Sequence, residues 1–319
     1  MTEPRSSLPR LILGIGELLW DVFPERALLG GAPANFAVMA ARLGNHAAIL
    51  SRVGRDDLGR RAIETLDPMP ADTSHVQIDS AHATGRVTVA LSADGQPAYT
   101  IHEDAAWDFL ELTDEWVQLA QRADAICFGS LAQRGPTSRQ TIQTLAAESS
   151  SRCARVFDVN LRAPFYTAEI LQESLELATV VKMNDAEVPL VLSLLGLPAE
   201  DEAIASRLRA GAGRLLAEFP NVELVAITCG ANGSLLVRRE GWHKHPGIAT
   251  KVADTIGAGD AFTAALTHYL LLGAGLAALN EAGNRWGSWM ASQAGAMPAL
   301  PDATREGIFA AIAEREMKA

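Results

Sequence analysis

Short apolar runs alternate with longer amphipathic stretches along most of the chain. The runs have the length of buried strands, whereas the stretches between them carry apolar residues at helical spacing. Strands are expected at 11–16, 18–23, 46–53, 76–78, 126–128, 156–159, 180–183 and 224–228, and helices at 34–43, 56–66, 137–147, 167–177, 187–195, 203–219, 261–272, 276–294 and 304–313. This alternation predicts an α/β fold: a doubly wound, mostly parallel sheet with helices on both faces.

Residues 85–102 break this pattern. Segments 85–92 and 98–102 alternate apolar and polar residues with a period of two, and the turn-like sequence Ala-Asp-Gly-Gln at 93–96 separates them. This predicts a β-hairpin with one apolar and one polar face. The central sheet of a doubly wound domain has no place for such a hairpin. We therefore expect a small β-lid, formed by about 17–24 and 84–106, inserted in a single domain that spans 1–319.

Composition narrows the class of protein. The chain has 319 residues, 48% hydrophobic and 20% charged, which is enough to bury one large core. Its net charge of −11 argues against a nucleic-acid-binding surface, which would be basic. Residues 1–10 lack the apolar region of a signal peptide, and the apolar run 261–279 includes His268 and glycines, which favours a buried helix and turn over a membrane span. We therefore expect a cytoplasmic protein.

The strongest chemical signal is the segment Asp-Thr-Ile-Gly-Ala-Gly-Asp at 254–260, directly before a helical pattern. Small residues at a helix start leave backbone N–H groups uncovered, and with the helix dipole these form an anion-binding pocket. The N–H groups of Gly257, Ala258 and Gly259 are placed to stabilise charge on a transferring phosphoryl group, while Asp260 takes a proton from a hydroxyl. The alternative is a glycine-rich turn in which Asp260 only caps the helix.

A second signal, Leu-Gly-Gly-Ala-Pro-Ala-Asn at 29–35, also opens a helix. The paired glycines Gly30 and Gly31 let a ligand approach the backbone closely, and Asn35 can both donate to and accept from a hydroxyl. Asp21 is a carboxylate within an apolar strand, and a bidentate carboxylate suits vicinal sugar hydroxyls. The alternatives are a tight strand-to-helix connection with an inert asparagine, and a strand-end aspartate that faces water.

Together, residues 30–35 and 254–260 resemble the two signatures of the ribokinase-like (phosphofructokinase B-type) family of carbohydrate kinases. Their order and separation also match, and the resemblance runs from about Leu11 to Pro301. Two independent motifs in the right order are a specific signal. The resemblance implies an ATP-dependent sugar kinase in which Asp260 activates the sugar hydroxyl, because the turn-and-cap alternative does not predict the other motif.

The resemblance also gives the predicted hairpin a role. This family closes a β-lid over the sugar, which excludes water from the phosphoryl group. Its members often pair lids between two subunits, so we expect a homodimer through the apolar face of Val87, Val89 and Leu91. The alternative is that this face packs on its own domain.

Further segments are similar to family motifs. The sequence Asp-Val-Asn-Leu-Arg at 158–162 looks like the strand-end D-x-N-x-R, whose arginine, here Arg162, lies near the transferred phosphate. Asn184 and Glu187 match the N-x-x-E motif, which organises Mg²⁺ and its waters. Each of these residues also has a purely structural interpretation: a surface ion pair for Arg162, a helix cap for Asn184, and hairpin turn residues for Gly230 and Gly233. The remaining candidates for ATP binding are the T-x-G-x-x-G turn and one late helix residue: Thr228, Gly230, Gly233 and Asn284.

One feature departs from the family pattern. Some members bind K⁺ through carbonyl groups, which here would belong to the segment that holds Asp254 and Ile256, and through a late serine hydroxyl. Ala299 stands in the place of that serine. A backbone carbonyl can replace a hydroxyl ligand, so potassium dependence stays open.

Three segments, at 16–24, 102–108 and 129–134, resemble the fructokinase branch. Within them, Trp107 either packs on the apolar face of a sugar or anchors the base of the lid. No basic cluster accompanies Asp21 or Asn35, which argues against a sugar phosphate as substrate. We expect fructose, phosphorylated on a primary hydroxyl. Another ketose, a 2-keto-3-deoxy sugar acid or a nucleoside is the alternative, and a non-catalytic sugar sensor is a remote one.

Two other nucleotide-binding classes fit less well. Residues 14–19 begin a dinucleotide-binding fingerprint but lack its third glycine, and the following stretch reads as a strand. The string G-x-x-x-x-G-K-[ST] of Walker-type NTPases does not occur.

Overall fold

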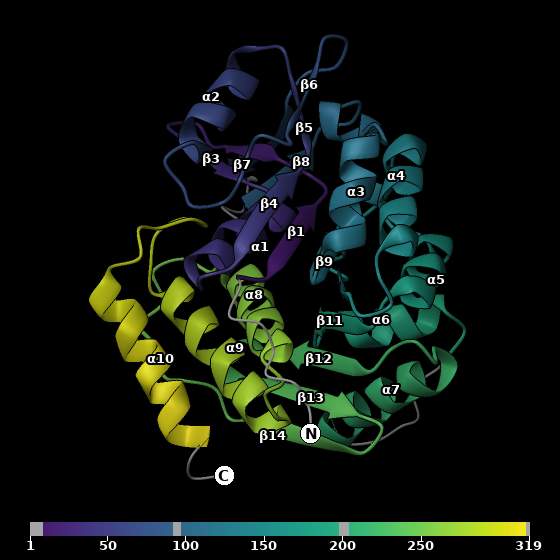
Figure 1. Cartoon of the computed structure of the whole chain (residues 1–319), viewed down its shortest axis with the longest axis vertical. Helices are drawn as coiled ribbons and strands as arrows, with labels where there is room; N and C mark the ends of the chain where they lie inside the picture. Colours follow the sequence, from purple (N-terminus) through teal and green to yellow (C-terminus); the bar gives the residue numbers. More distant parts are fainter. Residues whose placement is uncertain (1–8, 92–96, 198–203, 317–319) are drawn as a thin grey trace.

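The structure is a computed structural model that describes residues 9–91, 97–197 and 204–316 (Figure 1). Eight strands of this described part form one large sheet in the order β14-β13-β12-β11-β10-β9-β1-β4. Pairing is parallel from β4 to β12 and antiparallel between β12, β13 and β14. The predicted doubly wound, mostly parallel sheet is confirmed. Its strands are β1 (Leu11–Ile15), β4 (His46–Leu50), β9 (Ala125–Gly129), β10 (Ala154–Asp158), β11 (Val180–Asn184), β12 (Leu224–Thr228), β13 (Ser234–Arg238) and β14 (Gly241–His245).

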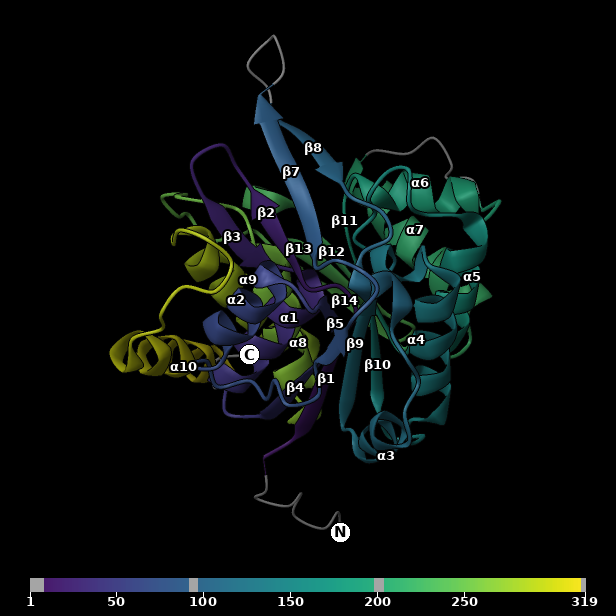
Figure 2. The same cartoon turned by 90° about the horizontal axis from the view of Figure 1, so that it is seen from above.

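Helices cover both faces of this sheet (Figure 2). One face carries α1 (Ala32–Arg42), α2 (Asp57–Leu66), α8 (Ala258–Leu271), α9 (Leu276–Ala291) and α10 (Asp302–Glu316), and the other carries α3 (Asp114–Arg122), α4 (Pro136–Glu148), α5 (Ala168–Leu177), α6 (Glu187–Leu194) and α7 (Ile204–Glu218). Strand β1 shows why: Ile12 packs in one hydrophobic core, whereas Leu13 and Ile15 pack in the other. Because side chains alternate along a strand, a central apolar strand must be buried on both faces.

A separate four-stranded sheet lies beside the large one, in the order β3-β2-β7-β8. Its strands are β2 (Leu19–Val22), β3 (Ala27–Gly30), β7 (Gly85–Leu91) and β8 (Pro97–Ile101), and the last two project from the body of the molecule (Figure 2). They are the predicted hairpin, and β2 is the strand expected to join it. The turn predicted at 93–96 lies outside the described residues. Strand β3 was not predicted, because its four residues run directly into the paired glycines.

Two of the three residues of the predicted apolar face of this hairpin are covered within the chain, and the side chain of the third, Leu91, lies outside the described part. Val87 and Val89 are buried and pack with Leu19 of β2, and Phe23 and Ile101 border this cluster. This is the packing that the alternative to a dimer contact describes, so Val87 and Val89 offer little free apolar surface. The homodimer stays a prediction.

The strand expected at 46–53 is interrupted in the structure, and β13 and β14 were not predicted. The single strand expected at 46–53 divides at Ser51, whose hydroxyl donates to the carbonyl O of Gly16 at 2.7 Å. Its second part, β5 (Arg52–Gly54), pairs with β6 (Gln77–Asp79) in a small sheet of its own rather than with the large sheet. In the described part of the chain, no helix has the length and apolar character needed to cross a membrane.

Candidate active site

A cavity of about 510 Å³, the Asp260 pocket, opens at the carboxyl-terminal edge of the large sheet. Both sheets contribute to its wall. Asp21 and Val87 come from the four-stranded sheet, Arg162 follows β10, and Asp260 lies in the first turn of α8. Ligands of open parallel α/β sheets bind at this edge, where strand ends and helix N-termini converge.

The two glycine-rich segments singled out in the sequence meet in this pocket. The side-chain amide of Asn35 donates to Oδ2 of Asp260 at 2.7 Å, across 225 positions of the chain. The contact joins the first turns of α1 and α8. Gly257 is the N-cap residue of α8, in the left-handed conformation, and no side chain caps this helix. Asp260 therefore does not serve as the cap that the alternative interpretation required.

The environment of Asp260 makes its carboxyl group more basic. Its pKa is raised to about 6, mainly by burial and further by the carboxylate of Asp158. The hydrogen bond from Asn35 and the charges of Lys182 and Arg162 lower the pKa and offset part of this rise. A carboxyl group with a pKa near 6 is ionised at neutral pH and still basic enough to accept a proton from a hydroxyl.

The predicted anion-binding amides lie at the start of α8, beside Asp260. Gly257 and Gly259 line the pocket. The amide of Ala258 already donates to the carbonyl O of Thr255, at a long 3.3 Å. The N-terminus of α8 thus faces the pocket. One of the three predicted amides, that of Ala258, is already hydrogen-bonded within the loop.

The predicted sugar-binding residues gather on the opposite wall. Asp21 and Gly31 line the pocket, and burial raises the pKa of Asp21, with Arg162 lowering it and Asp254 raising it further. Gly30 lies behind them, since a Cβ atom there would be 3.4 Å from Oδ2 of Asp21. Arg162 itself is exposed on the pocket wall, where its charge reaches both carboxyl groups.

The structure does not place Trp107 against the pocket. Its side chain is fully buried in a 3₁₀ turn at Ala106–Phe109, with the guanidinium of Arg134 4.1 Å from the ring centroid. A Cβ atom on Gly85 would approach Nε1 of Trp107 to 2.1 Å, so this ring packs directly under the start of β7. The expected stacking on a sugar is therefore wrong. The other interpretation, an anchor for the base of the hairpin, describes this position.

Asn184 and Glu187 brace two neighbouring strand ends. The amide of Glu187 donates to Oδ1 of Asn184 at 2.9 Å, and the amide of Asn184 donates to Oε2 of Glu187 at 2.8 Å. Oε1 of Glu187 accepts from the amide of Leu161 at 2.8 Å, beyond the end of β10. Each carboxylate oxygen thus holds one donor and keeps a second lone pair. The group fits a Mg²⁺ ion held through a water molecule better than one bound directly.

The remaining predicted nucleotide residues continue this row along the sheet edge. Thr228 pairs with Asn184 across β12 and β11, and Gly230 and Gly233 follow in the turn after β12 with positive φ. A hollow of about 540 Å³ opens beside this turn and is lined by Cys229, Asn232 and Trp242, among others. Asn284 is buried in α9, and its amide donates to Oγ of Ser234 at 2.6 Å, so it ties α9 to β13.

The segment before α8 is held by the side chain of Asp254. Its Oδ1 accepts from the amide of Ile256 at 3.1 Å, and its Oδ2 accepts from the amide of Gly295 at 3.2 Å. Both carboxylate oxygens thus fix the loop before α8, one to Ile256 and one to Gly295. Among the described residues, no group of three or more His, Cys, Asp or Glu side chains could hold a metal ion.

Comparison with known proteins decides the family. A family model described as pfkB family carbohydrate kinase matches residues 25–303. The chain belongs to this family. This kinase is therefore a phosphotransferase with an alcohol group as acceptor, and the predicted resemblance to ribokinase-like carbohydrate kinases is confirmed.

This pfkB-family kinase is similar to proteins described as fructokinases and sugar kinases. It is 30% identical to a fructokinase of Escherichia coli over 312 residues, which cover 90% of this chain and 95% of that protein. The structure of a sugar kinase from Pyrococcus horikoshii matches with a TM-score of 0.80 at 29% identity, over 97% of this chain and 100% of that chain. A fructokinase from Vibrio cholerae with fructose, ADP and calcium bound matches with a TM-score of 0.76 at 27% identity, over 94% and 98% of the two chains.

Two charged residues of the pocket of this kinase escaped the sequence analysis. Glu17 follows β1 and is 4% exposed; Ala32 donates to its Oε1 at 3.3 Å, whereas Oε2 is buried without a hydrogen-bond partner. Burial raises the pKa of Glu17 to about 7. Lys182 lies in β11 and also lines the pocket. Each is a charged residue within or beside an apolar strand, and that signal was visible in the sequence.

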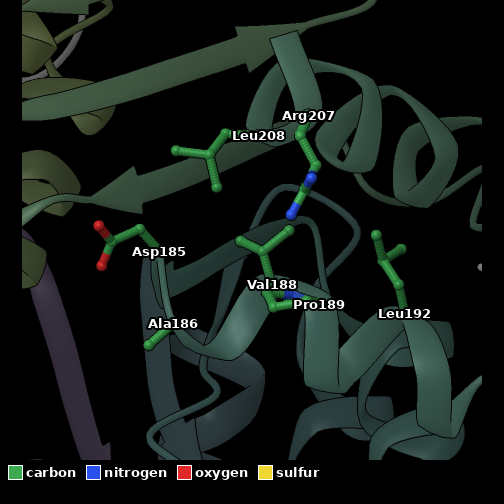
Figure 3. Close-up of a pocket in the computed structure, with 7 residues that line it drawn as sticks. All are labelled: Asp185, Ala186, Val188, Pro189, Leu192, Arg207 and Leu208. Carbon is green, nitrogen blue, oxygen red and sulfur yellow. The ribbon is translucent and has the colours of Figure 1, made fainter. Parts of the chain in front are cut away.

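A smaller hollow of the kinase lies away from these residues. It measures about 190 Å³ between α6 and α7 and contains none of the predicted site residues. Figure 3 shows Arg207 of α7 reaching toward Val188 and Pro189 of α6 across a mostly apolar wall. Asp185 marks the rim that this hollow shares with the one beside the Thr228 turn.

Proposed function

We propose that this kinase is an ATP-dependent fructokinase that phosphorylates a primary hydroxyl group of fructose. The observation that carries the proposal is the Asp260 pocket, in which a basic carboxylate meets a hydrogen-bonding asparagine and the N-terminus of α8. Fructokinase relatives that align over most of both chains support this choice of sugar.

The charges around the pocket favour a neutral sugar. Three carboxyl groups line it: Asp21 and Asp260, and Glu17, which carries only part of a charge at neutral pH because burial raises its pKa to about 7. Two cations accompany them, Arg162 and Lys182, and the second is paired with Asp158. An anionic acceptor such as a sugar acid or a sugar phosphate would meet an excess of like charge, and repulsion at close range is costly in a partly buried site. Hydroxyl groups can instead donate to these carboxylates.

The proposed roles follow from position. Asp21, Gly31 and Asn35 hold the sugar hydroxyls, with Gly30 behind them, and Asp260 accepts the proton of the attacking hydroxyl. The start of α8 and Arg162 stabilise negative charge on the phosphoryl group. The γ-phosphoryl group leaves ADP as its bond to the bridging oxygen breaks and a bond to the sugar oxygen forms. A β-lid formed by the four-stranded sheet closes over the sugar.

ATP is proposed to lie along the strand ends from β10 to β12. Thr228, Gly230 and Gly233 border its phosphates. Its base lies near Ser234, whose hydroxyl accepts a hydrogen bond from the amide of Asn284. Glu187 and Asn184 would hold Mg²⁺ through water, and this ion would neutralise phosphate charge. The carbonyl groups of Asp254 and Ile256 are the candidates for K⁺. A kinase named only as a sugar kinase has been solved in complex with ATP at 29% identity to this chain, which supports this nucleotide.

A substrate panel tests the proposal directly. ADP release would be measured with ATP and Mg²⁺ against fructose, ribose, 2-keto-3-deoxygluconate, adenosine and fructose 6-phosphate. We expect strong turnover with fructose and turnover at least roughly 100-fold lower with the two anionic acceptors, since unpaired like charge in the site costs a few kcal/mol. Turnover with another neutral acceptor would keep the role of Asp260 and replace fructose. Preference for the sugar acid would overturn the charge argument.

The pH dependence of this kinase is also predicted. Asp260 must be ionised to accept a proton, and its pKa is raised to about 6. We therefore expect kcat/KM to be constant near pH 8 and to fall about tenfold per pH unit below roughly pH 6. An aspartate with an ordinary pKa would show this fall only near pH 4.

The variant Asn35→Ala provides the internal check. The hydrogen bond from Asn35 lowers the pKa of Asp260, so its removal should move the acid limb of kcat/KM to higher pH. Loss of sugar affinity alone would lower the whole profile without moving the limb. A profile that stays flat from pH 5 to pH 8 in the wild type would contradict the assignment of Asp260 as base.

A further inference from the structure

A lysine is buried directly beneath the start of α8. Lys182 comes from β11, whose neighbouring residues Val181 and Met183 are apolar and fully buried. Its side chain is turned to the face that carries α8, and the residue is only 7% exposed. Nζ lies 3.1 Å from each carboxylate oxygen of Asp158, at the end of β10.

The ammonium group also reaches the Asp260 pocket. Lys182 is one of the residues that line it. A Cβ atom on Gly259 would stand 3.0 Å from Nζ, so the absent side chain leaves room for the ammonium group under the first turn of the helix. Thr263, one turn further along α8, donates to Oδ2 of Asp158 at 3.0 Å and to the carbonyl O of Gly259 at 2.9 Å. The helix start, the lysine and its partner are thus held in fixed relative positions.

The lysine keeps its charge in this position. Both carboxylate oxygens of Asp158 lie 3.1 Å from Nζ, so the ammonium group has its counter-charge within hydrogen-bond distance. A buried ion pair is weak support for stability, since apolar residues of similar volume often serve as well or better. Stability alone therefore gives little reason for a charged pair here. Its location beside an anion-binding helix N-terminus gives a functional one.

We propose that Lys182 is a further catalytic residue, which binds the phosphoryl group in transfer from below α8 through the space left by Gly259. Asp158 and Thr263 are its positioning residues. The γ-phosphoryl group moves from the bridging oxygen of ADP to the sugar oxygen, the sugar proton goes to Asp260, and Lys182 keeps its protons throughout. Its fixed charge adds to the amides of the helix N-terminus without any rearrangement during the reaction. This inference rests on the proposed site of phosphoryl transfer and not on the identity of the sugar.

The main test removes both members of the pair at once. In Lys182→Met/Asp158→Leu no charge is left unpaired, and Thr263 keeps its bond to Gly259, so we expect a Tm within about 4 °C of the wild type. We expect kcat with the best sugar of the panel to fall by roughly 10²-fold, the usual effect of losing one electrostatic donor, with the KM for the sugar nearly unchanged.

The single variant Asp158→Asn separates charge from structure. It breaks the same ion pair but keeps the lysine, so we expect it to lower Tm more than the double variant does and to retain kcat within about tenfold. If the pair served only to hold β10, β11 and α8 together, the single variant would lose at least as much activity as the double one. That order, or a double variant that keeps kcat within about threefold, would overturn the proposal.

A binding measurement makes the test independent of the sugar. Calorimetry would compare the affinities for ADP and for the imido analogue of ATP, which differ by the γ-phosphoryl group. We expect the double variant to lose affinity for the analogue about tenfold while it binds ADP within about twofold of the wild type. If the wild type phosphorylates no sugar of the panel, the proposed substrate fails while this ratio still decides the role of Lys182. An unchanged ratio together with unchanged kcat excludes that role.

Discussion

Asp260→Asn is expected to lower kcat by roughly 10²–10⁴-fold, the contribution of a positioned general base. The asparagine keeps the size of the side chain, and its Oδ1 can still accept from Nδ2 of Asn35, so the contact between α1 and α8 survives. What the variant loses is the group that takes up the proton of the sugar hydroxyl. Turnover with the best sugar of the panel, measured with the KM for sugar and for ATP, would show the effect in kcat.

The same variant should not cost stability. The pKa of Asp260 is raised to about 6 from an ordinary value of 3.8, so ionisation of this carboxyl group is disfavoured in the folded state. Wild-type stability is therefore lost as pH rises from about 4 to about 6, and the loss is complete above pH 6. The neutral asparagine avoids it. We expect the Tm of Asp260→Asn to equal or exceed that of the wild type at pH 8, with the difference shrinking as the pH falls from about 6 to about 4.

Asp56→Asn is the matched control. Asp56 caps α2, where its Oδ1 accepts from the amide of Gly59 at 2.8 Å, and asparagine caps helices about as well as aspartate. This variant should keep full kcat. If Asp260 were only a residue of a helix start, Asp260→Asn would behave in the same way, with little change in turnover. That result would remove the base from the mechanism.

The sequence contains two glycine-rich segments that lie far apart in the chain, one around Asn35 and one around Asp260. The local pattern around Asn35 and around Asp260 allows either a tight turn or a binding site. Their contact at 2.7 Å joins them into one site, and the family resemblance had foreseen that they work together. The doubly wound sheet was predictable because most of its buried strands are short apolar runs in the sequence.

Other positions could not be read from local pattern. Trp107 looked suited to stack on a sugar, but Gly85 and Arg134 enclose its ring, and neither contact is visible from the residues around the tryptophan. The charge of Lys182 within an apolar strand was visible, whereas its partner Asp158 lies on the neighbouring strand and becomes apparent only in the sheet. A charged residue in a buried run thus indicates that a partner exists, but the sequence does not say which residue that partner is. The fold supplies the partner.

The short strands at the edge of the fold were missed for another reason. Strand β3 ends at the paired glycines, and β13, which lies next to the edge strand β14, begins directly after the turn at Gly233, so each offers an apolar run of only three residues. Strand β14 includes Trp242 and His243 and is half exposed, so burial gives it no continuous apolar pattern. Edge strands are fixed by their pairing with a neighbour more than by their own composition.

Gly31→Ala is expected to damage both the fold and the site. Gly31 has a φ of 120°, which disfavours any L side chain, and a Cβ atom there would stand 2.3 Å from the carbonyl O of Glu17. A backbone oxygen cannot rotate aside, so the chain after β1 must move. We expect more than about 3 kcal/mol of destabilisation from strain and collision together, a fall in Tm of roughly 4 °C or more, and a KM for the sugar raised at least about tenfold.

Gly44→Ala isolates the part of this effect that comes from the collision. Gly44 follows the other end of the same helix, α1, and has a φ of 95°, but a Cβ atom there would meet no atom within 4 Å. The alanine should therefore cost only the conformational strain, about 1–2 kcal/mol, and leave the KM for the sugar unchanged. Thermal unfolding and sugar kinetics of the two variants would be compared side by side. Equal losses of Tm in both would show that Gly31 is needed only for its backbone conformation, and an unchanged KM in Gly31→Ala would place the sugar away from the start of α1.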